Sequence, residues 1–310
     1  MITALCGGVG GSKLVLGLYR TLPANELDVV VNTADDLEFL GLHVSPDLDT
    51  VTYTLAGIAQ EGLGWGIEGD SFEALGMLRQ YGAPAWFQVG DRDFATHVFR
   101  THALSSGTNL TAITSNIAAR LNVHAGILPM THEAVATKLL VGDEWVEFQE
   151  YFVRRRHRDT VSAIRYEGIE NASATVEVLD ALQHAEVVVL VNSNPALSIF
   201  PILSTLGVND LLVAVSAARV AVSPIVGSDA VSGPAGRLMK LLGHRSSATG
   251  VAEAYAGCID GIVIDDSDAE QVAAIEALGI AVHCTKTVMR TLEDRDRLAT
   301  ETVSFARSLK

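Results

Sequence analysis

A glycine-rich turn near the start of the chain has the composition of a phosphate-binding loop. Residues 7–13 read Gly-Gly-Val-Gly-Gly-Ser-Lys and separate an apolar run at 2–6 from a segment with the apolar spacing of a helix. Backbone N–H groups in such a turn approach an anion closely, and the helix dipole adds roughly half a positive charge there. The alternative is a tight turn that carries no ligand. We expect a phosphate here, bound by Gly8, Gly10, Gly11 and Lys13.

This turn matches neither of the two common nucleotide-binding fingerprints. A Walker loop requires Gly-Lys-Ser/Thr, whereas Ser12 precedes Lys13 in this chain. The dinucleotide pattern GxGxxG, counted from Gly8, would need its third glycine where Lys13 stands. The mismatches argue against a P-loop kinase and against a simple NAD site.

Carboxylates gather after a second apolar run and at the start of a predicted helix. Asp35 and Asp36 follow the run at 27–32, and Asp47 and Asp49 come about a dozen residues later. Ligands of open α/β sheets bind outside the carboxyl ends of the strands, so these side chains share an edge with the glycine turn. Hard oxygen ligands beside a diphosphate suggest Mg²⁺, for which we favour Asp35 and Asp49. Helix capping is the simpler explanation of Asp47.

A third polar cluster runs from Gly90 into another predicted helix. Asp91 is predicted to bind substrate, although it also suits a helix cap. Arg92 offers a guanidinium fork for a phosphate oxygen, and His97 a proton donor or shuttle. A structural histidine with satisfied hydrogen bonds is the alternative for His97.

Small polar residues follow two later apolar runs. They form the stretches 192–195 and 223–227, and a further small-residue turn lies at 231–236. Together with the glycine turn, they suggest one extended nucleotide crevice. The predicted binding residues of this part are Ser193, Asn194, Pro195, Ser223 and Pro224.

The elements that position these residues alternate between strands and helices. Short β-branched runs at 2–6, 27–32, 187–191, 219–222 and 262–264 predict buried parallel strands. Apolar residues at helical spacing predict helices at 49–57, 72–81, 94–104 and 110–121. Alternating apolar and polar residues at 136–140 and 145–152, on either side of Val-Gly-Asp-Glu, predict a β-hairpin.

This pattern predicts an α/β fold: a Rossmann-like, mostly parallel sheet with flanking helices and an inserted, largely helical cap. We expect one cooperative unit over 1–310, with the nucleotide-binding sheet core at about 1–45 and 170–310. The cap and hairpin insertion then covers about 46–169.

Composition excludes several classes of protein. The 310 residues carry a net charge of −15, which disfavours nucleic acid and anionic membranes as partners. Three isolated cysteines suggest neither a disulfide framework nor a zinc site, and the apolar stretch 211–226 is interrupted by polar residues. We expect a cytoplasmic protein without a membrane segment, and a homodimer as the commonest assembly. The basic run Arg-Arg-Arg-His-Arg at 154–158 is either a solvated loop or a contact to anionic substrate.

In order along the chain, these segments resemble the 2-phospho-L-lactate transferase (CofD) family of coenzyme F420 biosynthesis. The resemblance implies transfer of a 2-phospho-lactyl, phosphoenolpyruvyl or 3-phosphoglyceryl group from a guanosine diphosphate donor to the ribityl hydroxyl of the deazaflavin FO, with release of GMP. It spans nearly the whole chain. The stretches that carry it are Gly7-Gly8-Val9-Gly10-Gly11, residues 32–36, 45–50, 64–66, 90–93, 95–97, 148–149 and 193–195, and Ser223-Pro224-Ile225.

The same resemblance implies roles for individual residues. Asp49 would contact the ribityl end of FO or Mg²⁺, with Asp35 as a second catalytic, metal-binding carboxylate. The turn from Gly8 to Gly11 would hold phosphate, Ser193 and Asn194 would help to seat the guanosine, and Asp36 would bind substrate. Gln88 stands where archaeal members carry a lysine that contributes to FO binding, so it can supply a hydrogen bond but no charge. Three aromatic residues, each with the hydrophobic core as its alternative place, are candidates to stack on the deazaflavin: Trp65, Trp86 and Phe94.

Two other functions compete with this interpretation. A CofD-like regulatory protein that binds nucleotide sugars would not need the deazaflavin-side residues, and UDP-sugar binding without GDP binding would favour it. An NAD-dependent oxidoreductase rests on the α/β pattern and the glycine turn alone. Its fingerprint is broken at Lys13.

Overall fold

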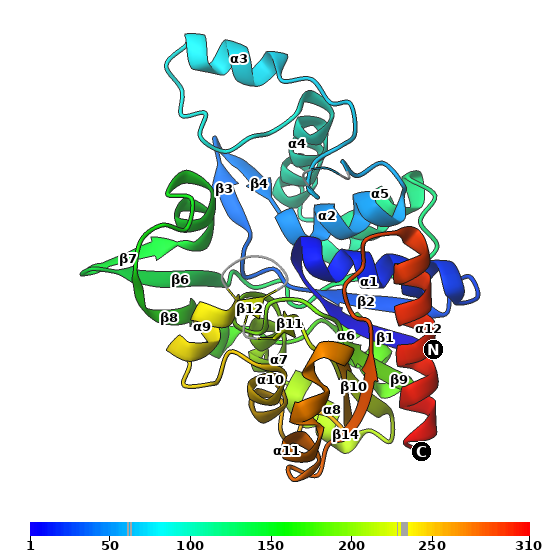
Figure 1. Cartoon of the computed structure of the whole chain (residues 1–310). Coiled ribbons are helices and arrows are strands. Elements are labelled where there is room, and N and C mark those ends of the chain that lie inside the picture. The colour runs from blue at the N-terminus through cyan, green and yellow to red at the C-terminus, as the bar shows by residue number, and fades with distance from the viewer. Residues whose placement is uncertain (61, 63, 228, 231–234) are drawn as a thin grey trace.

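A fully parallel sheet forms the centre of the fold in Figure 1, a computed structural model that describes residues 1–60, 62, 64–227, 229–230 and 235–310. Within these residues the sheet has seven strands in the order β14-β13-β10-β9-β1-β2-β5, and every neighbouring pair is parallel. The strands are β1 (Ile2–Cys6), β2 (Leu27–Val31), β5 (Gly126–Pro129), β9 (Val187–Leu190), β10 (Ala218–Val222), β13 (Gly261–Asp265) and β14 (Ala281–Thr285).

Helices cover both faces of this sheet, which explains why its central strands are continuous apolar runs. Alternate residues of one strand enter two separate cores, so Ala4 packs on one face and Leu5 on the other. The first face carries α1 (Gly8–Thr21), α2 (Pro46–Leu55), α5 (Leu110–Arg120) and α12 (Leu292–Ser308). The second carries α6 (Val176–Gln183), α7 (Phe200–Ser204), α8 (Val208–Ala214), α10 (Ala248–Ala254) and α11 (Val272–Glu276).

The order of the strands reverses between β1 and β9. From β1 the chain adds β2 and β5 on one side, and later β9, β10, β13 and β14 on the other. A crevice opens at such a switch point outside the carboxyl ends of the strands. The glycine turn follows β1 and residues 192–195 follow β9, so both predicted binding segments lie at this point.

Two further parts project beyond the carboxyl edge of the sheet (Figure 1). One contains the hairpin β3 (Leu37–Phe39) and β4 (Leu42–Val44), with α3 (Glu73–Gln80) and α4 (Asp91–Ser105). The other is a three-stranded antiparallel sheet, β6 (Ala136–Val141), β7 (Glu144–Glu147) and β8 (Val161–Glu167). The remaining elements are η1 (Glu150–Arg154), η2 (Ile169–Asn171), η3 (Pro195–Ile199), η4 (Asp266–Gln271), β11 (Ile225–Val226), β12 (Asp229–Ala230) and α9 (Ala235–Leu241).

The predicted fold class is confirmed, and so are the five predicted strands and four predicted helices, within a few residues at their ends. Two strands of the sheet were not predicted. The strand β5 is only four residues long, begins with Gly126 and ends with Pro129, and β14 is a half-buried edge strand. Both lack the buried apolar run by which the other strands are found.

The predicted extent of the second hairpin strand, residues 145–152, is wrong after Glu147. The strand β7 (Glu144–Glu147) does not continue to residue 152, because residues 150–154 form a helical turn. Phe148 and Phe152 are four residues apart, and their ring centroids lie 5.3 Å from each other, a contact that a helical turn allows. The hairpin belongs to a separate sheet and does not extend the central one.

The boundary between sheet core and insertion is less simple than the expected division at 46 and 169. The strand β5 pairs with β2, and α2 and α5 pack on the same face as α1, although all three lie inside that range. The turn expected at 231–236 lies outside the described residues except for Ala235 and Gly236. Within the described ranges, no helix combines the length and apolar character needed to cross a bilayer.

Candidate active site

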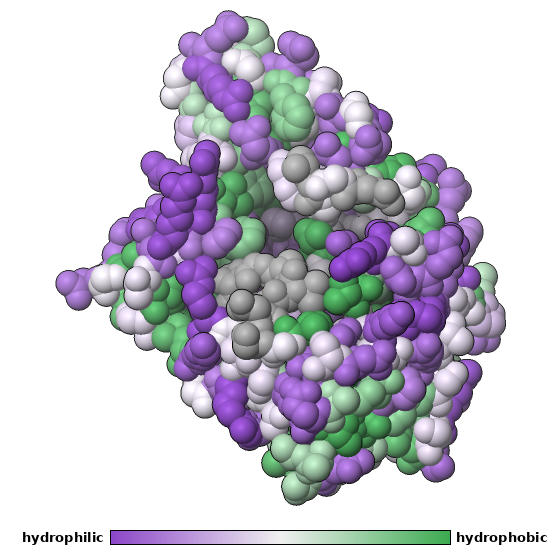
Figure 2. All heavy atoms as spheres, in the orientation of Figure 1, coloured by the Kyte–Doolittle hydropathy of each residue, from purple (hydrophilic) through white to green (hydrophobic). Residues whose placement is uncertain are grey.

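A cavity of about 550 Å³ opens where the sheet meets the two projecting parts. Figure 2 shows it as a hollow near the middle of the molecule. Ten of the predicted site residues line it: Gly8, Gly10, Lys13, Asp35, Asp49, Gln88, His97, Ser193, Asn194 and Pro224. The other six, Gly11, Asp36, Asp91, Arg92, Pro195 and Ser223, are not among its lining residues.

The glycine turn forms one wall of the cavity. Gly8 has a φ of +66°, a backbone conformation that residues with a side chain rarely adopt. Gly8, Val9 and Gly10 are the first residues of the helix α1 and line the cavity. Ser193 locks the turn to the end of β9, since its Oγ donates to Gly7 O at 2.6 Å and accepts from Gly7 N at 3.1 Å. Gly11 lies behind the wall, where a Cβ would overlap Ser193 Oγ and stand 2.8 Å from Cys6 Sγ. Gly11 therefore shapes the turn and does not face the cavity.

Two buried carboxyl groups stand beside the glycine turn. Asp47 accepts a hydrogen bond from Asn32 Nδ2 at 3.0 Å and another from the N–H of Gly8. Burial, and to a smaller extent the charge of Asp36, raises the pKa of Asp47 to about 7. Burial and the neighbouring charge of Asp47 likewise raise the pKa of Asp35 well above its ordinary value. Asp35 Oδ1 has no hydrogen-bond partner among the described residues, so this pair of carboxyl groups has unused acceptor capacity.

Asp36 does not line the cavity, and its contacts give it a structural role. Its Oδ2 accepts from Ser45 Oγ at 2.7 Å and lies 3.0 Å from His43 Nε2. Ser45 precedes the helix α2 and His43 belongs to β4. Asp36 therefore ties the projecting hairpin to the start of the helix that carries Asp47 and Asp49.

Asp49 is held by a buried arginine that sequence reasoning missed. Arg100 on α4 is 1% exposed and binds both carboxylate oxygens of Asp49, with Nη1 donating to Oδ2 at 3.0 Å and Nη2 to Oδ1. A two-pronged arginine–carboxylate pair fixes the orientation as well as the charge of the acid. Asp49 therefore reaches the cavity as an oriented carboxylate.

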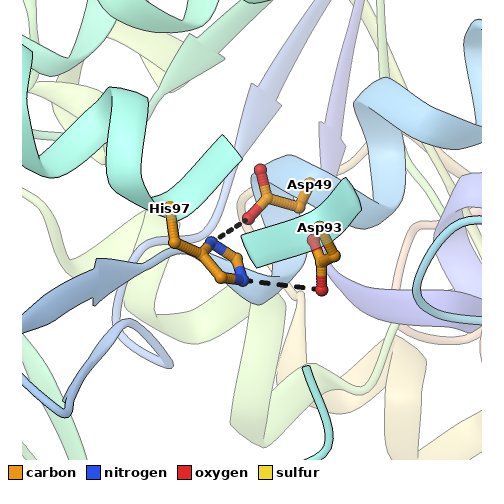
Figure 3. A group of neighbouring side chains, drawn as sticks. All are labelled: Asp49, Asp93 and His97. Atoms are coloured by element: carbon orange, nitrogen blue, oxygen red, sulfur yellow. Dashed lines mark ion pairs between the residues drawn. The ribbon is translucent and has the colours of Figure 1, made fainter. Parts of the chain in front are cut away.

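His97 joins the same network, and Figure 3 shows its two ring nitrogens facing the carboxylates of Asp49 and Asp93. Its Nδ1 lies 3.3 Å from Arg100 Nη1 and 3.7 Å from Asp49 Oδ2, and its Nε2 lies 3.5 Å from Asp93 Oδ2. Because a guanidinium can only donate, Nδ1 is the acceptor and the imidazole proton sits on Nε2. That N–H has no hydrogen-bond partner among the described residues, and His97 lines the cavity. His97 is thus a buried donor available to a ligand.

Tyr53 completes this cluster from α2. Its hydroxyl donates to Asp93 Oδ1 at 2.9 Å and contacts Thr96 Oγ1 at 2.7 Å. Burial, followed by the charges of Asp49 and Asp93, raises the pKa of Tyr53 and keeps the phenol protonated. The ring thereby braces α4 against α2.

The potential metal ligands of the cavity fall into two groups. One oxygen each from Asp49 and Asp93 and one nitrogen from His97 lie within 4.8 Å of one another, but Arg100 already occupies both oxygens of Asp49. A histidine nitrogen is also a poor ligand for Mg²⁺, which prefers oxygen. Asp35 and Asp47 offer oxygen donors only and have no cation beside them among the described residues. The second group suits Mg²⁺ better.

Asp91 and Arg92 stabilise the projecting part instead of facing the cavity. Asp91 accepts from Ser71 Oγ at 2.6 Å and from the N–H groups of Glu73 and Ala74 at 3.0 Å, so it caps α3 and not the helix α4 that it begins. Arg92 is exposed and donates to the carbonyl oxygen of Glu68. Arg92 does not line the cavity, and its predicted phosphate contact stays a prediction.

The segments after β9 and β10 contribute partly to the cavity and partly to the frame. Asn194 lines the cavity, while its Oδ1 accepts from Ala196 N at 3.0 Å and caps η3. Pro195 is the buried first residue of η3. Ser223 Oγ closes a turn with Ile225 and presents Pro224 to the cavity.

Aromatic side chains form a further wall of the cavity, and they are not the set that was predicted. Trp65 lines the cavity as expected, whereas Trp86 and Phe94 pack in a small core around Phe39. The aromatic residues that join Trp65 were missed as stacking candidates: Phe87, Phe148 and Phe152. The four-residue spacing of Phe148 and Phe152 is the signal that would have indicated a shared helical face.

The chain matches the family model described as 2-phospho-L-lactate transferase CofD over residues 2–299. A phosphoenolpyruvate transferase of Kitasatospora aureofaciens is 37% identical over an alignment that covers 100% of this chain and 98% of the relative. A 2-phospho-L-lactate transferase of Methanothermobacter thermautotrophicus is 40% identical, with 96% of each chain covered.

Among solved structures, a UPF0052-family protein of Bacillus halodurans has a TM-score of 0.66 and covers 97% of this chain and 98% of its own. Its sequence identity is 14%, so this likeness supports the fold alone.

Proposed function

The chain belongs to the 2-phospho-L-lactate transferase (CofD) family and is a transferase, and from this premise we propose that it acts in coenzyme F420 biosynthesis. In the proposed reaction, a three-carbon phospho-acid group moves from a guanosine diphosphate donor to the ribityl hydroxyl of FO, and GMP leaves. The acid is 2-phospho-lactate, phosphoenolpyruvate or 3-phosphoglycerate.

One observation carries this proposal: a single cavity joins a glycine turn suited to a diphosphate, an aromatic wall suited to a flat ring, and an oriented carboxylate. The donor diphosphate would lie on the α1 amino terminus, with Lys13 near it. Ser193, Asn194 and Pro224 would contact the guanosine. The ring of FO would lie against Trp65, Phe87, Phe148 and Phe152, with Gln88 beside it, and its ribityl chain would reach Asp49.

The chemistry requires one substitution at phosphorus. The hydroxyl oxygen of FO forms a bond to the acid-bearing phosphorus, and the bond from that phosphorus to the GMP phosphate oxygen breaks. Asp49 orients the hydroxyl and accepts its proton, while GMP leaves as an anion. His97 Nε2–H donates to a phosphate oxygen at which negative charge builds up. No covalent intermediate with the enzyme is needed.

The cavity offers oxygen ligands that suit Mg²⁺, because Asp35 has a buried oxygen without a hydrogen-bond partner among the described residues and stands beside a second carboxyl group. Asp35 and Asp47 would both bind the ion, and Asp49, the other predicted metal ligand, also lines the cavity. When bound, the ion neutralises charge on the diphosphate and on the departing GMP.

Stability should respond to pH and Mg²⁺ together. Folding raises the pKa of Asp47 from 3.8 to about 7, so the folded chain binds this proton more tightly than the unfolded chain. The contribution of Asp47 to stability is therefore largest at acid pH and falls as the pH rises through 4 to 7. Mg²⁺ needs the ionised form, so it should stabilise the protein at pH 8 by about 2.7 kcal/mol at a hundredfold excess over its Kd, and far less at pH 5.

Thermal unfolding with and without Mg²⁺ at both values of pH tests this expectation. Asp35→Asn should remove most of the Mg²⁺ response. Asp28→Asn is the matched control, because Asp28 also has a pKa raised by burial but does not line the cavity. An equal Mg²⁺ response in wild type and Asp35→Asn would rule out Asp35 as a ligand.

Substitutions at two neighbouring glycines of the turn test ligand binding and fold stability separately. Gly10→Ala should leave the melting temperature unchanged, because the nearest atom to its Cβ would be Asn192 O at 3.5 Å, yet the methyl group faces the cavity and should weaken GDP binding. Gly11→Ala should destabilise the fold by about 1–3 kcal/mol through overpacking. Melting curves and GDP titrations measure both; unchanged GDP affinity in Gly10→Ala would argue against a phosphate at this turn.

A transfer assay tests the function itself. Purified protein, Mg²⁺ and FO are incubated with each of the three guanosine diphosphate donors, and products are identified by mass. A phosphodiester from one donor would establish the reaction and its acid. If GDP binds but no donor gives a product, the chain would be a nucleotide-binding member of the fold without this activity.

A further inference from the structure

The charged side chains that line the cavity are mostly acidic, although its proposed donor is a polyanion. Asp35, Asp47, Asp49 and Asp93 line it, and Lys13 is the only lysine or arginine among its described lining residues. The whole chain carries a net charge of −15. Such a field repels an approaching anion unless a local positive region offsets it.

The densest basic segment of the chain lies at the edge of this cavity. Phe152 and Val153 line the cavity, and residues 154–158 follow them directly. His157 stacks on Phe152 with ring centroids 5.0 Å apart, which holds the segment close to the aromatic wall. Ala235 also lines the cavity, and Arg237, two residues later, donates to His157 O at 3.3 Å. We call Arg156, Arg158 and Arg237 the basic rim.

The arginines of this region differ in how far their charge is neutralised. Arg155 lies within 3.7 Å of Glu144, Glu150 and Asp159, so its charge is balanced locally. Arg156 and Arg158 are exposed, and their guanidinium groups have no acidic or hydrogen-bonding partner within the described residues. Figure 2 shows strongly hydrophilic side chains along this edge of the hollow, around the helical turn that follows β7.

We propose that the basic rim is an electrostatic docking site for the phosphate and carboxylate groups of the anionic donor at the mouth of the cavity. The inference rests on the proposed function, because the donor is the nucleoside diphosphate named there. The positive charge of the basic rim attracts the nucleotide to the mouth of the cavity despite the negative surface, and the glycine turn then binds the diphosphate. FO is an alcohol, so its binding depends less on the rim.

The test measures association and dissociation of a fluorescent GDP by stopped flow. The variant is Arg156→Gln/Arg158→Gln. The matched control, Arg79→Gln/Arg120→Gln, removes the same charge from two exposed arginines on α3 and α5 that do not line the cavity and have no side-chain partner within the described residues. At low salt the rim variant should associate about tenfold more slowly with an unchanged dissociation rate. At about 1 M salt, where the Debye length is about 3 Å, all three proteins should associate equally.

Each result decides a separate question. Equal association rates of the rim variant and the wild type at low salt would overturn the inference while leaving the transferase proposal intact. An equal slowing of both double variants would also overturn it, because net charge alone would then explain the effect. A wild type that binds no GDP at any salt concentration would overturn the proposed function and the rim together.

Discussion

Asp49→Asn is expected to lower turnover by about a thousandfold while GDP still binds. The asparagine keeps the shape of the side chain but cannot accept the proton of the attacking hydroxyl. GDP would contact the glycine turn and the end of β9, which this substitution does not touch. Turnover is measured in the transfer assay, and GDP affinity by titration, at a temperature where the variant is folded.

A loss of activity in this variant has a second possible source, because Arg100 loses its carboxylate partner. The buried guanidinium is then uncompensated, and stability falls as well. The control Asp36→Asn removes another carboxylate of the same region, partly buried, that does not line the cavity. If Asp49→Asn binds GDP and retains wild-type turnover, Asp49 does not act on the hydroxyl; if Asp36→Asn loses as much turnover, the loss reflects stability.

The parts of the site that could be predicted lie in contiguous motifs at strand ends. The glycine turn follows β1, and residues 192–195 follow β9, so one rule about parallel sheets brings them together. Asp35 and Asp49 were found in the same way. Adjacency in the sequence suggests one site for Asp35 and Asp36, but the two lie in a turn after β2, and Asp36 instead contacts Ser45 and His43.

The parts that escaped prediction depend on contacts between distant elements. Arg100 stands in no motif, and its partner Asp49 is 51 residues away in the sequence. Helical spacing nevertheless contains a clue: Asp93, His97 and Arg100 recur at intervals of four and three residues and therefore share one face of α4, whereas Arg92 does not. The aromatic wall likewise needed the helical turn at 150–154, which the strand alternation of its sequence conceals.

The basic segment at 154–158 illustrates a different limit. Its sequence leaves a solvated loop and an anion contact equally open, since charge alone does not reveal location. Its place beside the cavity follows from the cavity-lining Phe152 and Val153 that precede it and from the contacts of His157 with Phe152 and Arg237.

Arg100→Met is expected to have the largest effect on stability, a loss of about 3–5 kcal/mol. Methionine fills similar space but leaves the Asp49 carboxylate buried, 5% exposed, without its cationic partner. His97 also loses the donor to Nδ1, so its proton is no longer confined to Nε2. Chemical denaturation measures the loss, and turnover should fall together with it.

A double substitution separates the structural role of Arg100 from its positioning role. Arg100→Met/Asp49→Asn removes both charges, so it should recover part of the stability lost in Arg100→Met, because no unpaired carboxylate remains. Turnover should stay low, since the oriented carboxylate is absent. If the double variant is no more stable than Arg100→Met, the two residues are not coupled. If Arg100→Met keeps full turnover in its folded fraction, Asp49 needs no partner to be oriented, and its catalytic role would have to rest on the cavity alone.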